Sequence, residues 1–177
     1  TAKSISSTLT GIAVDKGILD LDGPLPFAWP PDPRKGVPDP RERIKLRDVL
    51  HMSSGLMPVD IYKGKNVIGS WLSYFAGWDS GYEARNRGLI REPGSFFVYE
   101  NYDTLLSVFA LRTVLANDKA YREFPRRELF DKIGMRSTIP GMDRFGNYVL
   151  SSQVYTNSRD LARVGLLYLN EGLWNGE

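Results

Sequence analysis

The sequence predicts a mainly helical chain, which is either an all-α protein or the helical part of an α/β domain whose sheet lies in other segments. Apolar residues recur at helical spacing in several segments, whereas only residues 146–156 favour extended structure. The chain has 177 residues, 42% hydrophobic and 25% charged, so it is long enough and apolar enough to bury a core. We expect the helices at about 4–14, 46–53, 66–76, 101–116, 119–133 and 158–170.

The first expected helix contains no charged residue between Ser4 and Val14. Apolar residues such as Ile5 and Leu9 recur along one face, and the other faces carry Ser, Thr and Gly rather than Lys or Glu. A helix without charge on any side is expected to be buried all round. Residues 20–40, which follow it, are rich in Pro and Gly and predict a loop.

Turn residues set the remaining boundaries. The helix at 46–53 is expected to stop at Ser53-Ser54-Gly55, and the polar, glycine-rich residues 79–95 are interpreted as an irregular segment that ends in the turn Pro93-Gly94. The dense apolar residues of 101–116 indicate a core helix. Glycines at 134 and 172 are expected to end the helices at 119–133 and 158–170.

The composition excludes several kinds of functional site. The sequence has no cysteine, which rules out thiol catalysis, disulfides and cysteine-bound zinc. Its single histidine, His51, would have to serve any Ser-His-Asp triad, and a site with several histidine ligands is excluded. We interpret His51 as structural, and Ser53 and Ser54 as turn residues rather than nucleophiles.

The charges are nearly balanced, with a formal net charge of +2. The nearest approach to a basic cluster, Arg122 with Arg126 and Arg127, is interrupted by acidic residues, so no nucleic-acid partner is expected. The sequence contains no apolar run of about 18 residues, so no membrane-spanning helix is expected either.

Lys3 is the only charge in the first turns of an otherwise uncharged helix. One interpretation is a lysine at a frayed helix start whose ammonium reaches water. The other is a lysine held in the interior as a base beside a nucleophile. A serine three residues earlier would share its helical face, and that position is the one directly before Thr1. Within the chain, no lysine has a serine at this spacing, and no G-x-S-x-G motif occurs.

Tyr99-Glu100-Asn101 lies between the Pro93-Gly94 turn and the helix expected at 101–116. One interpretation is structural, with Asn101 as the cap of that helix. The other places the phenol of Tyr99 at the helix start for proton transfer, and lets the Asn101 amide bind a substrate or hold Lys3.

Several segments, in order along the whole chain, resemble the serine hydrolases related to class C β-lactamases and penicillin-binding proteins. The opening TAKS resembles the end of an S-x-x-K-S motif, and LRDVLHMSSGL resembles the family's L-x-x-L-L-x-H-T-S-G-L segment. REPGSFFVYEN is similar to the P-G-x-x-F-x-Y-S-N stretch that carries the family's Y-x-N motif. YREFPRRELFDKIGM resembles the stretch ending in L-G-M, and SRDLARVGLLYLNEGLWNGE resembles the A-R-D-L-A-R-F-G segment and its continuation.

The resemblance implies an α/β fold of the β-lactamase/transpeptidase type, in which this chain supplies mainly the helical lobe and most of the antiparallel sheet lies outside it. Residues 1–177 would then be an internal fragment of one domain, starting just after the nucleophilic serine and ending before a K-T-G or H-T-G motif. One departure from the family pattern is Glu100, which replaces a small residue and is expected to alter the charge beside Tyr99.

The resemblance also implies a serine hydrolase that forms an acyl-enzyme, with Lys3 and Tyr99 as proton-transfer groups and Asn101 orienting substrate or Lys3. The partner is a small ester or amide, no metal or cofactor is needed, and an extracytoplasmic location is favoured. The esterase and 6-aminohexanoate-oligomer hydrolase branch is the nearer one. The alternatives are a catalytically silent relative that serves as a binding or assembly module, and an unrelated all-α interaction protein.

Overall fold

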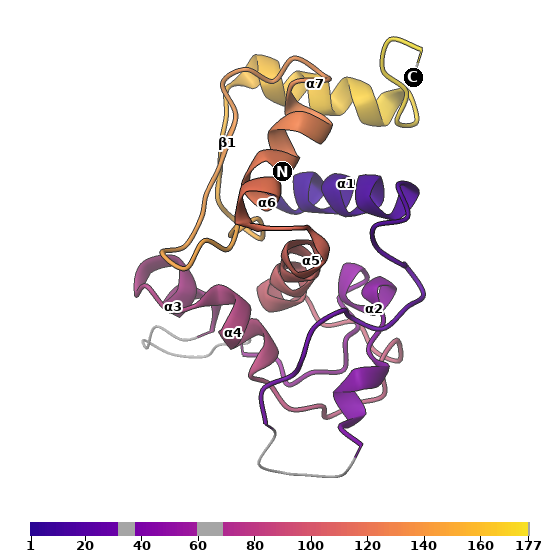
Figure 1. The fold of residues 1–177 in the computed structure, drawn as a ribbon, viewed down its shortest axis with the longest axis vertical. Helices are drawn as coiled ribbons and strands as arrows, with labels where there is room; N and C mark the ends of the chain where they lie inside the picture. Colours follow the sequence, from indigo (N-terminus) through magenta and orange to yellow (C-terminus); the bar gives the residue numbers. More distant parts are fainter. Residues whose placement is uncertain (32–37, 60–68, 177) are drawn as a thin grey trace.

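The computed structural model describes residues 1–31, 38–59 and 69–176, which form a stack of helices with a small pair of strands beside it (Figure 1). The elements in chain order are α1 (Ala2–Asp15), η1 (Pro40–Arg43), α2 (Leu46–Leu50), α3 (Ser70–Phe75), α4 (Ser80–Arg85), α5 (Asn101–Val114), α6 (Asp118–Pro125), η2 (Arg126–Phe130), β1 (Ile139–Pro140), β2 (Val154–Tyr155) and α7 (Ser158–Leu169).

Helix α5 lies at the centre of the molecule and contacts α1, α2, α4 and α6 (Figure 1). Its buried side chains include Leu105, Leu106 and Leu111, which the apolar density of this segment predicted. Because four helices pack on it, the orientation of α5 fixes where its first residue, Asn101, lies.

Helix α1 has the predicted position, but the expectation that it is buried on every side was wrong. Ile5 and Leu9 lie in the core, at 0% and 1% exposure, whereas Ser4, Ser7 and Gly11 are exposed. The reason is that α1 packs on α5 and η2 along one side. Small uncharged residues are tolerated at a surface, so their presence does not by itself require burial.

The short helices differ most from the predictions. Helix α2 ends at Leu50, before the predicted residue 53, because Met52 adopts a positive φ of 54° that no helix continues. Helix α3 begins at Ser70, and residues 66–68 of the predicted helix lie outside the described residues. Helix α4 lies within 79–95, where no helix was predicted; the Asp79 carboxylate caps it by accepting from the backbone N–H groups of Gly81 and Tyr82.

The predicted helix at 119–133 is divided in two. Pro125 ends α6, and the chain continues as the π-helical turn η2, because a proline inside a helix removes one backbone donor and crowds the preceding turn. The segment then stops at Gly134, whose φ of 72° gives the left-handed conformation expected of a helix-ending glycine.

The sheet within the described residues is very small. Ile139 pairs with Tyr155 and Pro140 with Val154 in an antiparallel ladder, and a separate bridge joins Met142 to Tyr148. Of the segment 146–156 that was predicted to be extended, only β2 lies in the ladder. A mainly helical chain with little sheet agrees with the helical lobe that the sequence predicted.

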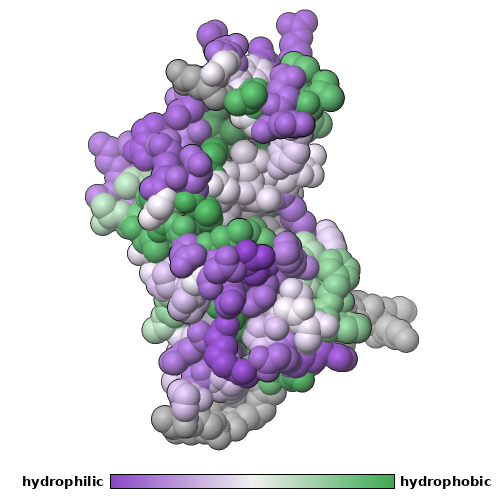
Figure 2. Space-filling model, turned by 90° about the vertical axis from the view of Figure 1, so that its right-hand side faces the viewer, coloured by the Kyte–Doolittle hydropathy of each residue, from purple (hydrophilic) through white to green (hydrophobic). Residues whose placement is uncertain are grey.

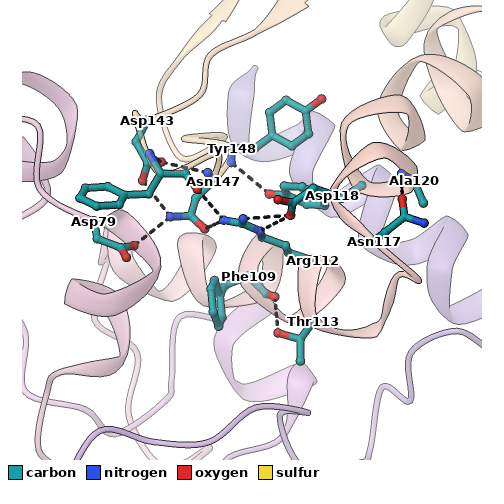
Figure 3. Close-up of polar contacts among 12 residues, drawn as sticks. Asp79, Phe109, Arg112, Thr113, Asn117, Asp118, Ala120, Asp143, Asn147 and Tyr148 are labelled. Carbon is teal, nitrogen blue, oxygen red and sulfur yellow. Dashed lines mark hydrogen bonds and ion pairs between the residues drawn. The ribbon is translucent and has the colours of Figure 1, made fainter.

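A polar network joins α4, α5 and the loop before β2 (Figure 3). The Asn147 amide donates to Asp79 and Asp143, at 2.9 Å each, and its carbonyl accepts from Arg112 at 2.6 Å. Burial alone would raise the pKa of Asp143, but hydrogen bonds from Ser80 and Asn147 outweigh it and lower that pKa. Asp143 therefore stabilises the folded chain in its charged form.

Apolar side chains remain at the surface of several elements. Trp71 and Phe75 of α3 are 55% and 71% exposed, and Leu169 at the end of α7 is 76% exposed. On the face drawn in Figure 2, hydrophobic residues form separate patches among hydrophilic ones. No helix that the structure describes combines the length and the apolar character needed to cross a membrane.

A buried ion pair holds the start of α5. The Arg87 guanidinium donates to the Asp103 carboxylate at 2.8 Å, and the two side chains are 2% and 3% exposed. The Ser54 hydroxyl also donates to Asp103, at 3.0 Å. Asp103 stands two residues after Asn101. The ion pair therefore ties the first turn of α5 to Arg87, and the hydrogen bond ties it to Ser54.

Replacing one member of this pair should destabilise the fold strongly. Arg87→Leu leaves the Asp103 carboxylate buried without its cation, and we expect the free energy of unfolding in urea to fall by about 3–5 kcal/mol. The matched control is Arg43→Leu, because Arg43 and Glu92 form an exposed pair, with side chains 58% and 63% exposed. Exposed ion pairs contribute little to the free energy of unfolding. Equal losses for the two variants would show that the Arg87 pair has no special role.

Candidate functional site

Lys3, Asn101 and Ser151 meet although they are far apart in the sequence. The Lys3 ammonium donates to the side-chain oxygen of Asn101 and, at 2.6 Å, to the backbone carbonyl of Ser151. Lys3 is half-buried, since it lies at the first turn of α1 where this helix contacts α5. The interpretation of Lys3 as a frayed lysine in open water is therefore wrong: its ammonium is held by two oxygen acceptors.

Tyr99 borders the same cluster. The Lys3 ammonium lies 4.9 Å from the centre of the Tyr99 ring, within the range of a cation–π contact, and the side chain of Tyr99 is exposed. Among the residues with described positions, no direct hydrogen bond joins the ammonium to the phenol. Proton transfer between Lys3 and Tyr99 thus requires a bridging water or a small movement of the ring.

Asn101 is not the cap of α5, contrary to the structural interpretation of the sequence. Glu100 occupies the N-cap position, and its carboxylate accepts from the backbone N–H of Tyr102 at 3.4 Å. Because the cap lies one residue earlier, the Asn101 side chain projects from the first turn of the helix. Its amide oxygen accepts from Lys3, and its amide nitrogen donates to the Ser70 hydroxyl at 3.1 Å.

Glu100, which was expected to alter the charge beside Tyr99, turns its carboxylate into the interior. Its side chain is buried, and its second oxygen accepts from the backbone N–H of Val59 at 2.9 Å. Neighbouring side chains of an extended segment point to opposite sides, so Tyr99 faces outward where Glu100 faces inward. The carboxylate is thus used in capping and in holding residue 59.

Three residues of the cluster were not predicted: Ser70, Tyr74 and Ser151. The Tyr74 hydroxyl is hydrogen-bonded to the Ser151 hydroxyl, and Ser70 is hydrogen-bonded to Asn101. Helix α3 therefore contacts both residues that hold Lys3. Serine and tyrosine are common residues, and nothing in their spacing distinguishes these. Ser151 binds Lys3 through its backbone carbonyl. Every residue type has this group, so the sequence does not reveal the contact.

The remaining candidates take the structural places expected of them. His51 is exposed at the carboxyl end of α2. Ser53 donates to the carbonyl of Asp48 at 3.2 Å, and Ser54 donates to Asp103. Over residues 1–31, 38–59 and 69–176, no group of three or more His, Cys, Asp or Glu side chains is placed to hold a metal ion.

Comparison with known proteins gives one family and a set of similar folds. The sequence profile of the family described as beta-lactamase matches residues 1–176. No curated protein matches significantly.

A solved structure from Bacillus anthracis, described as a candidate 6-aminohexanoate-dimer hydrolase, is 18% identical with a TM-score of 0.77, over 99% of this chain and 48% of that one. A D-amino acid amidase from Ochrobactrum anthropi is 15% identical with a TM-score of 0.67, over 97% and 54%. A β-lactamase/D-alanine carboxypeptidase from Yersinia pestis is 20% identical with a TM-score of 0.64, over 92% and 50%.

These likenesses show the β-lactamase/transpeptidase type of fold, and the chain spans about half the length of the three solved structures.

The cap at Glu100 can be tested separately from the cluster. Glu100→Ala removes the acceptor for two backbone N–H groups, and we expect the free energy of unfolding to fall by about 0.5–2 kcal/mol or somewhat more. Glu100→Gln keeps an oxygen acceptor and should recover most of this loss. Both values come from urea unfolding followed by circular dichroism. If Gln were as damaging as Ala, the negative charge rather than the cap would be what matters.

Proposed function

Because the chain belongs to the β-lactamase family, we propose that it forms part of a serine hydrolase that cleaves an ester or amide bond through an acyl-enzyme. The observation that carries this proposal is the position of Lys3. Its ammonium is held by Asn101 and by the Ser151 carbonyl, next to an exposed tyrosine. The three groups that the family resemblance assigns to the reaction, Lys3, Tyr99 and Asn101, therefore lie together.

The nucleophile in this proposal is a serine directly before Thr1. In this proposal the helix of α1, described from Ala2, continues back through Thr1, so that a serine three residues before Lys3 shares its face. The third motif of the family, a K-T-G or H-T-G strand, would follow Glu177 in the intact protein. The 177 residues are thus proposed to be an internal part of one hydrolase domain.

The reaction then uses the groups of the cluster in sequence. The serine oxygen attacks the carbonyl carbon of the substrate, and its proton passes to the base, which is either the neutral amine form of Lys3 or the phenolate form of Tyr99. Collapse of the tetrahedral intermediate breaks the bond to the leaving group, which takes up that proton. Water then attacks the acyl-enzyme and releases the acid. Asn101 serves Lys3 in this scheme, since its amide oxygen accepts from the ammonium.

For the substrate, we favour an ester or a short linear amide over a β-lactam. Support comes from the similarity to the Bacillus anthracis structure, the highest TM-score of the three quoted, and from the sequence resemblance to the esterase and oligomer-hydrolase branch. The competing function is a silent relative that acts as a binding or assembly module. The convergence of Lys3, Tyr99 and Asn101 counts against it.

A covalent probe decides between a hydrolase and a silent module. We expect the intact protein to react with a fluorophosphonate, and peptide mass spectrometry should place the adduct on a serine directly before Thr1. The same protein should hydrolyse p-nitrophenyl butyrate faster than nitrocefin. Any other amino acid at that position, or an adduct elsewhere with no turnover, would contradict the assignment.

Removing the phenolic hydroxyl of Tyr99 should slow acylation and leave the fold intact. Tyr99→Phe retains the ring, and since a positioned acid or base is typically worth about 10²–10⁴-fold, we expect a loss of that order in the acylation rate. The thermal unfolding midpoint should stay unchanged, because the side chain is 58% exposed. Tyr155→Phe is a matched control at 64% exposure. A Tyr99→Phe protein with normal acylation would remove Tyr99 from the mechanism.

A further inference from the structure

One face of α3 adjoins both groups that hold Lys3. Ser70 is the first residue of α3, is fully buried, and accepts a hydrogen bond of 3.1 Å from the amide nitrogen of Asn101. Tyr74 follows one helical turn later and is hydrogen-bonded to the Ser151 hydroxyl. Side chains one turn apart lie on the same face of a helix, so a single face of α3 reaches two separate segments of the chain.

The two segments are the ones that supply the acceptors of Lys3. Asn101 accepts with its amide oxygen, and Ser151 accepts with its backbone carbonyl. The hydrogen bond to Ser70 fixes which end of the Asn101 amide faces the lysine, because the nitrogen turned to Ser70 leaves the oxygen for Lys3. The bond to Tyr74 holds residue 151 by its side chain, on the same residue whose carbonyl binds the ammonium.

We infer that Ser70 and Tyr74 are positioning residues of the hydrolase: acting through Asn101 and Ser151, they hold the side-chain nitrogen of Lys3 at the place where it exchanges a proton with the nucleophile. This inference rests on the proposed function for its catalytic meaning. The placing of Lys3 itself is a property of the structure and can be measured without turnover.

The inference separates two kinds of residue on α3. Ser70 and Tyr74 belong to the face that contacts the acceptors of Lys3. Ser73 lies on the same short helix and is also buried, but its hydroxyl contacts Tyr102 at 3.2 Å and neither acceptor of Lys3. Ser73→Ala therefore removes a buried hydroxyl from α3 and leaves the lysine contacts in place, which makes it the matched control.

The test compares Ser70→Ala, Tyr74→Phe and Ser73→Ala in the intact protein by two independent measurements. The first is hydrolysis of p-nitrophenyl butyrate, with kcat and KM determined separately. The second is trace acetylation by acetic anhydride, in which mass spectrometry compares the labelling of Lys3 with that of Lys119 in the same sample. Lys119 is a suitable internal reference, because its side chain is 79% exposed.

We expect Ser70→Ala and Tyr74→Phe to lower kcat by about 3- to 20-fold with little change in KM, as for loss of a hydrogen bond that orients a reacting group. Lys3 should become about 2- to 10-fold more reactive relative to Lys119, since an amine released from a fixed acceptor is more accessible to the reagent. Ser73→Ala should leave both quantities at the wild-type value, even if it lowers the unfolding midpoint.

The two measurements separate failure of this inference from failure of the proposed function. If the wild-type protein hydrolyses nothing, the function fails, and the labelling of Lys3 still decides whether α3 holds the lysine. If all three variants change kcat and Lys3 labelling alike, or none of them changes the labelling, α3 has only a structural role and the inference is overturned.

Discussion

The arrangement of this chain depends on taking one ammonium group partly out of water. A half-buried lysine must replace its lost hydration with fixed oxygen acceptors, because burying a charge without partners is strongly unfavourable. The acceptors of Lys3 come from α5 and from the segment before β2, so both must approach the start of α1. The packing of α5 among four helices and the buried Arg87–Asp103 pair bring Asn101 to that place. The core packing therefore places the acceptors that the Lys3 ammonium needs.

The cluster is possible because the neighbouring residues Glu100 and Asn101 have different roles. A helix start needs an acceptor for its free backbone N–H groups, and an asparagine in that position would use its oxygen there. Glu100 meets this need, so Asn101 can offer both ends of its amide to other side chains. Near the carboxyl end of α5, Asn147 also uses both ends of its amide, and it links Arg112 to two carboxylates (Figure 3).

The long, strongly periodic helices were predictable, and the short ones were not. The patterns at 4–14, 101–116 and 158–170 gave α1, α5 and α7 nearly to their ends, because apolar spacing alone decides such segments. Helix α4 was missed since its apolar content is low and its cap at Asp79 is the main local signal. At the site, Lys3, Tyr99 and Asn101 stood out by motif and by misplaced charge. Ser70, Tyr74 and Ser151 did not, because tertiary contacts alone give them their place.

The alternation of Tyr99 and Glu100 limits how this region can change over evolutionary time. The segment from Gly94 to Glu100 is exposed as far as Phe97, and only its last residues alternate, so that Tyr99 points outward and Glu100 inward where the chain enters α5. Substitutions among its exposed residues, such as Phe96 and Phe97, keep that order. Loss or gain of a single residue between Val98 and Glu100 would exchange the two sides, so a carboxylate would face solvent and a phenol would enter the interior. Relatives with the same arrangement of Tyr99 and Glu100 should therefore vary the exposed residues 94–97 freely but keep the spacing between these two residues and α5 constant.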